Sequence, residues 1–196
     1  MAYTPGGSFQ IDVREIKAAA DRYKDLGKQW GPVLTRTVNW VGARANTQVR
    51  RALSQQMGAP QKEIGPMLQI FPATWGNIQY IIAGGGRPLS LRAFGASQRQ
   101  KGVSARPWGV RRIFRGTFIV GSLGGSVYKR TGEFRTATKG KKKGQRVEGI
   151  EKLWGPGVPT ELVRGNTKLA FEQTVKKHFP ERIEHEVARA MRKLKR

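Results

Sequence analysis

Residues able to do catalytic chemistry are few and poorly spaced in this chain of 196 residues. The two histidines are His178 and His185, and His185 with Glu186 begins the H-E-x-x-H pattern of zinc peptidases. The place of the second histidine in that pattern holds Arg189, so a two-histidine zinc site cannot form. We therefore interpret both histidines as surface residues of a helix and predict no metal site.

Other catalytic patterns are equally incomplete. The three aspartates, Asp12, Asp21 and Asp25, lie among Lys and Arg residues, which indicates ion pairing along a helix rather than acid–base catalysis. Residues 84–88 contain the glycines of a phosphate-binding loop but lack its Gly-Lys-Ser/Thr ending. The G-x-S-x-G pattern of a nucleophile elbow is absent. The sequence predicts a protein that is not an enzyme and needs no cofactor.

The feature of the sequence that points to a binding function is a set of basic side chains interleaved with aromatic ones. Basic side chains neutralise phosphates, and aromatic rings stack on bases. Trp108, Phe114 and Phe118 are open to two interpretations, base stacking or packing in a sheet, and we favour packing. The residues that we expect to contact DNA or an acidic partner are Arg99, Lys101, Arg106, Arg111, Arg112, Arg115, Lys129, Arg130, Lys139, Lys141, Lys142, Lys143 and Arg146. Because no zinc finger, RNP signature or clear helix-turn-helix is present, contact with nucleic acid should not depend on its sequence.

The composition explains why such contacts are expected. Lys and Arg total 37 against 13 Asp and Glu, which gives a formal net charge of +24. Residues 61–147 alone hold 17 of these cations and 2 of these acids. A protein this basic attracts nucleic acid, acidic proteins or anionic lipid. The lack of cysteine suits a reducing cytoplasm, and we expect neither a signal peptide nor a membrane span, because the apolar runs are too short.

The elements that position these residues follow from the spacing of apolar side chains. In residues 12–57 apolar residues recur every three or four positions around a glycine-containing break, which predicts a helical hairpin or two helices at an angle. Residues 77–83, 102–108 and 117–130 combine short apolar runs with glycine clusters, which predicts antiparallel strands, the last range being a hairpin. Residues 139–144 contain four lysines and are expected to form a mobile loop.

The C-terminal part returns to helical spacing. Its apolar stripe runs from Leu169 to Leu194, and Pro180 is expected to kink or restart the helix. The residues that we assign to a packing or oligomer surface are Val175, Phe179, Ile183, Val187 and Met191. The sequence thus predicts an α+β fold in one structural unit: an N-terminal helical hairpin (1–60), a central antiparallel sheet with long basic loops (61–159) and a long C-terminal helix (160–196).

Short motifs in this order resemble those of a known family. RPLSL occupies residues 87–91, VYKR ends a strand pair at residues 127–130, and IEKLWGPGVP at residues 150–159 precedes the last helix. With these motifs and a basic loop between the second and third, the chain from residue 30 onwards resembles the minor tail protein Z family, the tail-completion proteins of lambda-type bacteriophages. One departure is Gly149, which stands where the family has a proline.

The resemblance implies a structural protein at the head-proximal end of a phage tail, needed for tail completion and head–tail joining. The implied partners are tail-tube, terminator or head–tail connector proteins and further copies in a hexameric ring, with DNA contacted non-specifically if at all. The implied location is the virion, after assembly in the host cytoplasm. The alternative is a free nucleic-acid-binding protein associated with ribosomes or the nucleoid. A membrane-surface protein is a weaker interpretation, because no helix joins a strongly apolar face to a uniformly basic one. The identity of the neighbouring genes would distinguish a tail-completion protein from a free nucleic-acid-binding protein.

Overall fold

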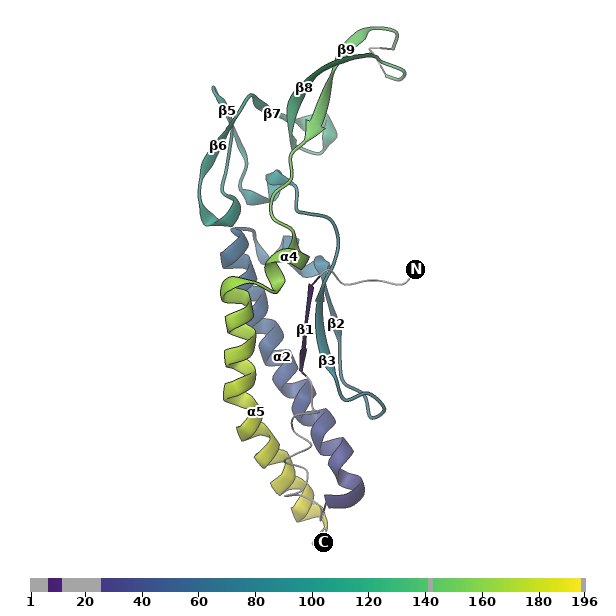
Figure 1. The fold of residues 1–196 in the computed structure, drawn as a ribbon, viewed down its shortest axis with the longest axis vertical. Helices are drawn as coiled ribbons and strands as arrows, with labels where there is room; N and C mark the ends of the chain where they lie inside the picture. Colours follow the sequence, from purple (N-terminus) through teal and green to yellow (C-terminus); the bar gives the residue numbers. More distant parts are fainter. Residues whose placement is uncertain (1–6, 12–25, 141–142, 195–196) are drawn as a thin grey trace.

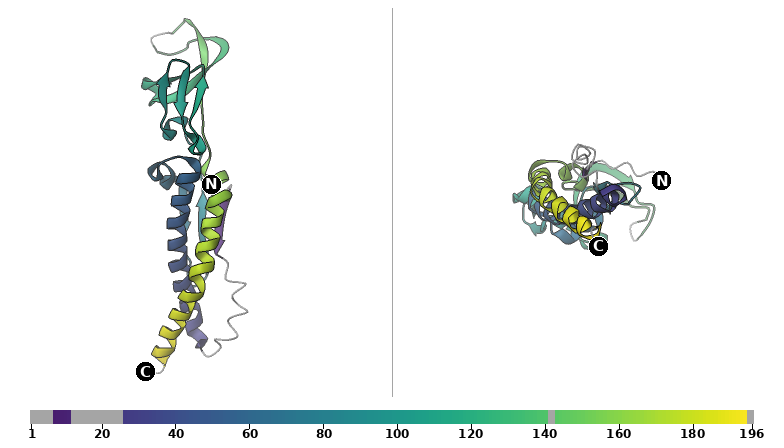
Figure 2. Two further views of the ribbon diagram at one scale, coloured as in Figure 1. Left: turned by 90° about the vertical axis from the view of Figure 1, so that its left-hand side faces the viewer. Right: turned by 90° about the horizontal axis from the view of Figure 1, so that it is seen from below.

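A computed structural model describes residues 7–11, 26–140 and 143–194 of the chain. The molecule is elongated, with a helical body at one end and two small sheets at the other (Figure 1, Figure 2). The predicted α+β class is confirmed, since two long helices accompany three antiparallel sheets of three strands each. The first arm of the expected helical hairpin, within residues 12–26, lies outside the described residues except at its end.

Two helices that are far apart in the sequence build the body, α2 (Trp30–Met57) and α5 (Gly165–Leu194). They run antiparallel and side by side over most of their length (Figure 1, Figure 2). The apolar side chains that α2 contributes to the core are Val33, Leu34, Val38, Val41, Ala45, Val49, Leu53 and Met57. The helix ends at Gly58, whose φ of 74° lies in the left-handed region that glycine adopts without strain.

The apolar stripe of α5 packs against the rest of the same chain. Ile183 and Val187 are buried. The stripe residues that are partly buried against the core are Val175, Phe179 and Met191. Leu169 and Leu194 were wrongly included in the stripe, because their side chains are 50% and 52% exposed. The helix continues through Pro180 instead of restarting there.

One sheet belongs to the body. Its strand order is β1 (Gly7–Ile11), β3 (Tyr80–Gly84) and β2 (Leu68–Phe71). The ring of Tyr80 lies directly on Gly42 of α2, and a Cβ at position 42 would be 2.3 Å from the ring. Phe9 of β1 stacks on Phe171 of α5 with 4.5 Å between the ring centroids. The sheet is therefore held against both long helices.

The other two sheets form the opposite end of the molecule, shown at the top of Figure 1. The first contains β4 (Ser97–Arg99), β5 (Gly102–Ala105) and β6 (Arg112–Arg115), and the second contains β7 (Thr117–Val120), β8 (Ser126–Thr136) and β9 (Arg146–Lys152). The predicted hairpin over residues 117–130 is confirmed as β7 and the start of β8, joined by the 3-10 turn η6 (Gly121–Leu123). The far parts of β8 and β9 project beyond the body, and we call residues 131–140 and 143–149 the arm.

Short segments join the two ends of the molecule. They are α3 (Gln61–Ile64), η3 (Gly65–Met67), η4 (Leu91–Phe94), η5 (Pro107–Gly109) and α4 (Val158–Leu162). Two chain segments pair here, because the N–H of Gly155 donates to the carbonyl of Leu89 at 2.7 Å and that of Leu91 donates to Leu153 at 3.2 Å. Residues 87–91 and 150–159, which are far apart in the sequence, therefore meet at the waist of the molecule.

The strands differ from the sequence prediction in number and extent, and those that were not predicted are β1, β2, β4, β6 and β9. The single central sheet is replaced by three small sheets, one of which includes the unexpected strands β1 and β2. The strand predicted over residues 102–108 ends at Ala105, because Pro107 has no N–H to donate and begins η5.

Candidate basic interface

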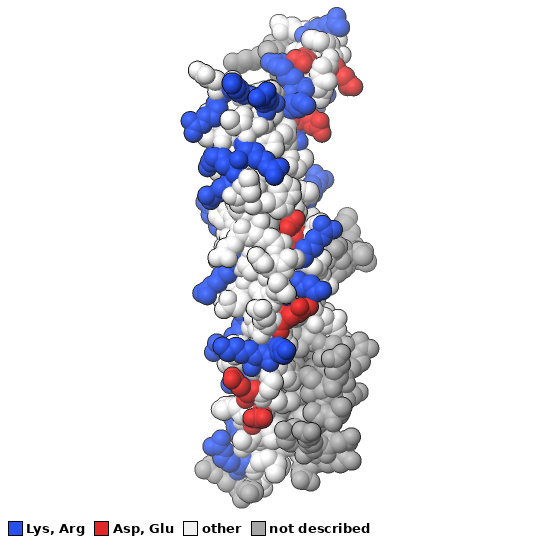
Figure 3. Space-filling view, turned by 60° about the vertical axis from the view of Figure 1, so that its left-hand side comes forward, with Lys and Arg blue, Asp and Glu red and all other residues white. Residues whose placement is uncertain are grey.

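Lys and Arg side chains occur along the whole length of the face in Figure 3, and acidic side chains are fewer there. Three of the predicted contact residues gather at the turn between β4 and β5. Arg99 and Arg115 both lie opposite Gly102 in the sheet, one on each neighbouring strand, and Lys101 is in the turn. All three are exposed, and none has an ion-pair partner among the described residues. We call Arg99, Lys101 and Arg115 the turn cluster.

The turn cluster depends on Gly102. Its φ is 139°, and a Cβ at this position would lie 2.0 Å from the carbonyl oxygen of Phe114. Any larger residue would therefore disturb the pairing of β5 with β6. The sequence identifies a strand that begins at this glycine but not the close approach that requires it.

Three further predicted contact residues lie at the opposite end of the same sheet. Arg112 pairs in register with Ala105. Arg111 donates from Nη1 to the hydroxyl of Ser104 at 3.1 Å, which fixes its guanidinium. Arg106 is exposed, and its side chain has no hydrogen-bond partner among the described residues. The basic residues of this sheet therefore form two separate groups.

On the second sheet, one predicted contact residue forms an ion pair with an acidic neighbour. Lys129 is exposed and lies opposite Glu151 in register. Arg130 donates to Glu148 at 2.9 Å, and the N–H of Gly132 donates to the other oxygen of the same carboxylate at 3.2 Å. Glu148 thus holds an irregular step in the β8–β9 pairing between Arg130 and Phe134. Arg130 is less available to an anionic partner than its exposure suggests.

Gly149, the departure from the family pattern, lies at this irregular step. A Cβ at position 149 would be 2.6 Å from the hydroxyl oxygen of Thr131. A residue with a side chain would require the Thr131 side chain to move. Glycine at this position leaves room for the side chain of Thr131 on the paired strand.

The arm carries the remaining predicted residues. Arg146 lies with its guanidinium 4.9 Å from the ring centroid of Phe134, which is itself 58% exposed. Lys139 and Lys143 are exposed near the tip, where Ala137 and Gln145 close the hairpin through a 2.9 Å backbone hydrogen bond. The two lysines between them in the predicted set, Lys141 and Lys142, lie outside the described residues.

The aromatic residues of the basic region have different environments. Phe114 is half-buried against the core, as the packing interpretation predicts. Phe118 is half-buried, with the guanidinium of Arg130 5.4 Å from its ring centroid. Trp108 is 51% exposed, but its ring N–H donates to Glu161 at 3.1 Å and its backbone has a φ of 53°. Trp108 is therefore tied to the body of the molecule.

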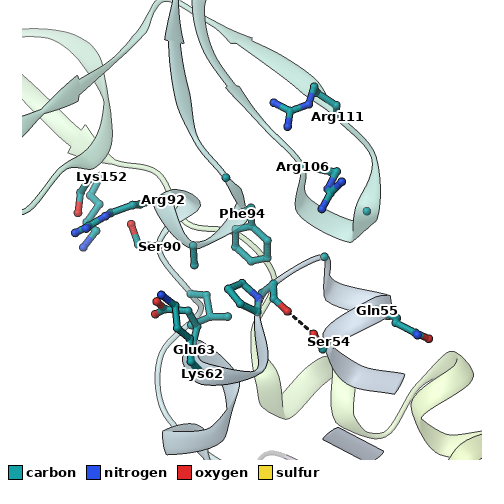
Figure 4. A pocket seen from close by; sticks show the side chains of 18 residues that line it. Ser54, Gln55, Lys62, Glu63, Ser90, Arg92, Phe94, Arg106, Arg111 and Lys152 are labelled. Carbon is teal, nitrogen blue, oxygen red and sulfur yellow. Dashed lines mark hydrogen bonds between the residues drawn. The ribbon is translucent and has the colours of Figure 1, made fainter. Parts of the chain in front are cut away.

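A wide cleft lies between the helical body and the two upper sheets (Figure 4). Its volume is about 1150 Å³, and we call it the waist cleft. Its basic lining residues are Lys62, Arg92, Arg106, Arg111 and Lys152, and its acidic lining residue is Glu63. Sequence reasoning did not select Lys62, Arg92 or Lys152, because each is isolated from the dense basic runs and only the fold brings them together.

The two histidines lie outside this region. Glu186, beside His185, is fully buried between the helices and accepts hydrogen bonds from Arg182 and, at 2.7 Å, from Arg36. Burial alone would raise the pKa of Glu186, but the hydrogen bond from Arg36 and the charges of Arg182, Arg36 and Arg189 outweigh it and lower the pKa. Within the described residues, no three His, Asp or Glu side chains are grouped to hold a metal.

No helix in the described part of the chain has the length and apolar character that crossing a membrane requires.

Comparison with known proteins adds nothing to these observations. No protein-family model, curated protein or solved structure matches the chain.

Proposed function

We propose that this chain is a structural tail-completion protein of a long-tailed bacteriophage. It acts at the head-proximal end of the tail, where it is needed for tail completion and head–tail joining, and it has no catalytic role. Its partners are tail-tube, terminator or connector proteins and further copies of itself in a hexameric ring. It becomes part of the virion after assembly in the host cytoplasm.

The observation that carries the proposal is the pairing of two motifs at the waist. Residues 87–91 and 150–159 provide two of the three motifs that resemble the tail-completion family, and backbone hydrogen bonds join Leu89 with Gly155 and Leu91 with Leu153. A Cβ at Gly155 would lie 2.2 Å from the ring of Phe94, so this junction is tightly packed. Motifs that meet in this way shape the molecule rather than perform chemistry, which suits an assembly protein.

The arm also supports a role in assembly. The six residues of β8 that belong to the arm, from Thr131 to Thr136, are all exposed, and Phe134 is an apolar side chain among them. A two-stranded hairpin is marginally stable alone in water. Contact with a neighbouring subunit would cover such an arm and its cations.

Deletion of the gene from the phage that carries it tests the proposal. We expect filled heads and separate tails in the lysate by electron microscopy, and recovery of joined particles when the intact gene is supplied in trans. Gold-labelled antibody should bind at the head-proximal end of complemented tails. Normal infective particles after deletion, or labelling at another part of the virion, would contradict the proposal.

A free nucleic-acid-binding protein is the second candidate function. The turn cluster favours it, because its side chains are exposed and have no ion-pair partner in the described part of the chain. The two candidates differ in where the protein is found. A tail-completion protein copurifies with virions through a density gradient, whereas a ribosome- or nucleoid-associated protein stays with host particles.

A further inference from the structure

We propose that the waist cleft binds an extended acidic segment of a partner protein. The cleft is open between the end of α2 with α3 on one side and the upper sheets on the other. Figure 4 shows Arg106 and Arg111 on one side of Phe94, with Arg92 and Lys152 on the opposite side. Basic residues therefore line the cleft on both sides of Phe94.

The charge balance of the cleft calls for an anionic ligand. Of the residues that the structure describes, five basic side chains line it, together with a single carboxylate, that of Glu63. Among the described residues Glu63 forms no ion pair that would neutralise Lys62 or Arg106. Cations grouped without counter-charge repel one another, so binding of an anion relieves this repulsion.

Hydrogen-bond donors in the cleft are fixed in place yet incompletely used. Arg111 donates from Nη1 to Ser104, and Arg92 donates from Nη1 to the carbonyl of Gly124. Each guanidinium has five N–H groups, so other donors stay available after these contacts. A guanidinium held in this way loses little freedom when it binds a carboxylate through two hydrogen bonds.

The lining favours a peptide over nucleic acid. Single-stranded nucleic acid binds through aromatic rings on which bases stack. Among the described residues, Phe94 is the one aromatic residue that lines the cleft, and at 1% exposure it offers no such ring face. In an extended peptide, successive side chains point to opposite sides, so neighbouring carboxylates can reach both basic walls.

The acidic segment must come from a protein other than a second copy of this chain. No two acidic residues are adjacent anywhere in the sequence, and the net charge of each copy is +24. A second copy therefore offers no run of carboxylates to place between the walls.

Binding of fluorescein-labelled hexaglutamate to the purified chain tests the site by fluorescence anisotropy. The measurement is made at 0.15 M salt, where the Debye length of about 8 Å screens distant charges. In one variant Lys62→Gln and Arg106→Gln are combined. In a matched control Lys176→Gln and Lys177→Gln remove the same charge from exposed positions on α5. Labelled hexaserine and a thymidine hexanucleotide serve as comparison probes.

We expect the cleft variant to bind hexaglutamate at least about tenfold more weakly, because each charge-assisted hydrogen bond contributes on the order of tenfold in affinity. The α5 control should stay within about twofold of the parent. Equal losses in both variants would show that only net charge matters. Tighter binding of the hexanucleotide, weakened by the same cleft substitutions, would make the cleft a nucleic-acid site. Either result overturns the proposal.

A second measurement does not depend on removing cations. The chain has no cysteine, so Gln55→Cys places a single thiol at the cleft. It should react faster than Leu169→Cys, an exposed position on α5, with hexaglutamate whose terminal cysteine is activated as a mixed disulfide with 5-thio-2-nitrobenzoate. The protein thiolate attacks the cysteine sulfur of the peptide, the new disulfide forms, and thionitrobenzoate leaves and is measured by its absorbance. Equal rates would overturn the proposal. Both measurements use the purified chain alone, so their outcome does not depend on the proposed tail function. The gene-deletion experiment tests that function separately.

Discussion

At the scale of single residues, one glutamine joins the two long helices to the waist. The amide nitrogen of Gln56 donates to the carbonyl and the carboxylate of Glu161 at 3.0 and 2.8 Å. Its amide oxygen accepts from both the backbone N–H and the hydroxyl of Thr167 at 3.1 Å. A polar side chain with every hydrogen-bonding group used specifies a single arrangement of its neighbours.

We expect Gln56→Ala to lower the free energy of unfolding by about 1–3 kcal/mol, because it leaves partly buried partners without hydrogen bonds. Gln55→Ala is the matched control, since Gln55 is exposed and no described residue bonds its side chain. Urea denaturation followed by circular dichroism measures both. Equal stability of the two variants would contradict the role assigned to Gln56.

Glu186 should make the stability of the helix pair depend on pH. Its pKa in the folded protein lies below the ordinary value of 4.5, chiefly because the hydrogen bond from Arg36 and the neighbouring charges outweigh burial. Its stabilising effect is therefore complete above the ordinary carboxyl pKa and is lost as pH falls through the lowered pKa. The structure predicts acid-induced loss of stability rather than loss at alkaline pH.

The comparison of the parent with Glu186→Gln between pH 7 and pH 3 checks this expectation. The parent should be the more stable protein at pH 7, and the difference in unfolding free energy should shrink below about pH 4.5. Titration of the other carboxyl groups is common to both proteins and cancels in the difference. A difference that stays constant over this range would show that the Glu186 charge is unimportant.

At the scale of elements, the stripe on α5 is an internal packing surface. We expect Ile183→Asp to lower the free energy of unfolding by at least about 3 kcal/mol, because the buried isoleucine is removed and an unpaired carboxylate is introduced. Leu169→Asp on the same helix is the control, since that side chain is half exposed. Thermal unfolding of both should show a large drop for the first alone. Similar melting temperatures would contradict the pairing of α5 with α2.

The elements also show how far the sequence predicts the fold. The second helix and the hairpin over residues 117–130 are visible from local spacing and glycine turns, and both were predicted correctly. The strands β1 and β9 were not predicted, because β1 pairs with β3 across some seventy residues and β9 consists largely of polar residues. Strand pairing over such separations is tertiary information that a short window cannot supply.

The candidate interface was predicted unevenly for a similar reason. Exposed cations of the basic central region, including those of the turn cluster, were selected from the sequence. The waist cleft could not be predicted, because Lys62 and Lys152 are ninety residues apart in the sequence. They line the same cleft in the folded chain, where residues 87–91 pair with residues 150–159. The hydrogen bond from Arg130 to Glu148 could not be predicted from the sequence either, since it depends on the register of β8 and β9.

At the scale of the whole molecule, any binding of DNA should be electrostatic and independent of base sequence. The exposed turn cluster lies at the end of a sheet, and α2 and α5 are packed together in the body rather than presented as recognition helices. Contacts of this kind go to phosphates, which carry no base information. Affinity should therefore fall steeply with salt, with a slope of roughly −0.9 for each phosphate neutralised.

The last prediction uses the turn cluster to test this mode of binding. Arg99→Ala, Lys101→Ala and Arg115→Ala together should reduce the salt slope by roughly 0.9 for each phosphate that is no longer neutralised, and leave relative affinities for two unrelated duplexes unchanged. The control combines Lys168→Ala, Lys176→Ala and Lys177→Ala on α5, which removes the same charge elsewhere. If both variants flatten the slope equally, binding reflects net charge rather than a surface. If one duplex is strongly preferred, an element that reads bases is present. If neither duplex binds at low salt, the cations serve acidic protein partners, which favours the assembly role over the free nucleic-acid-binding one.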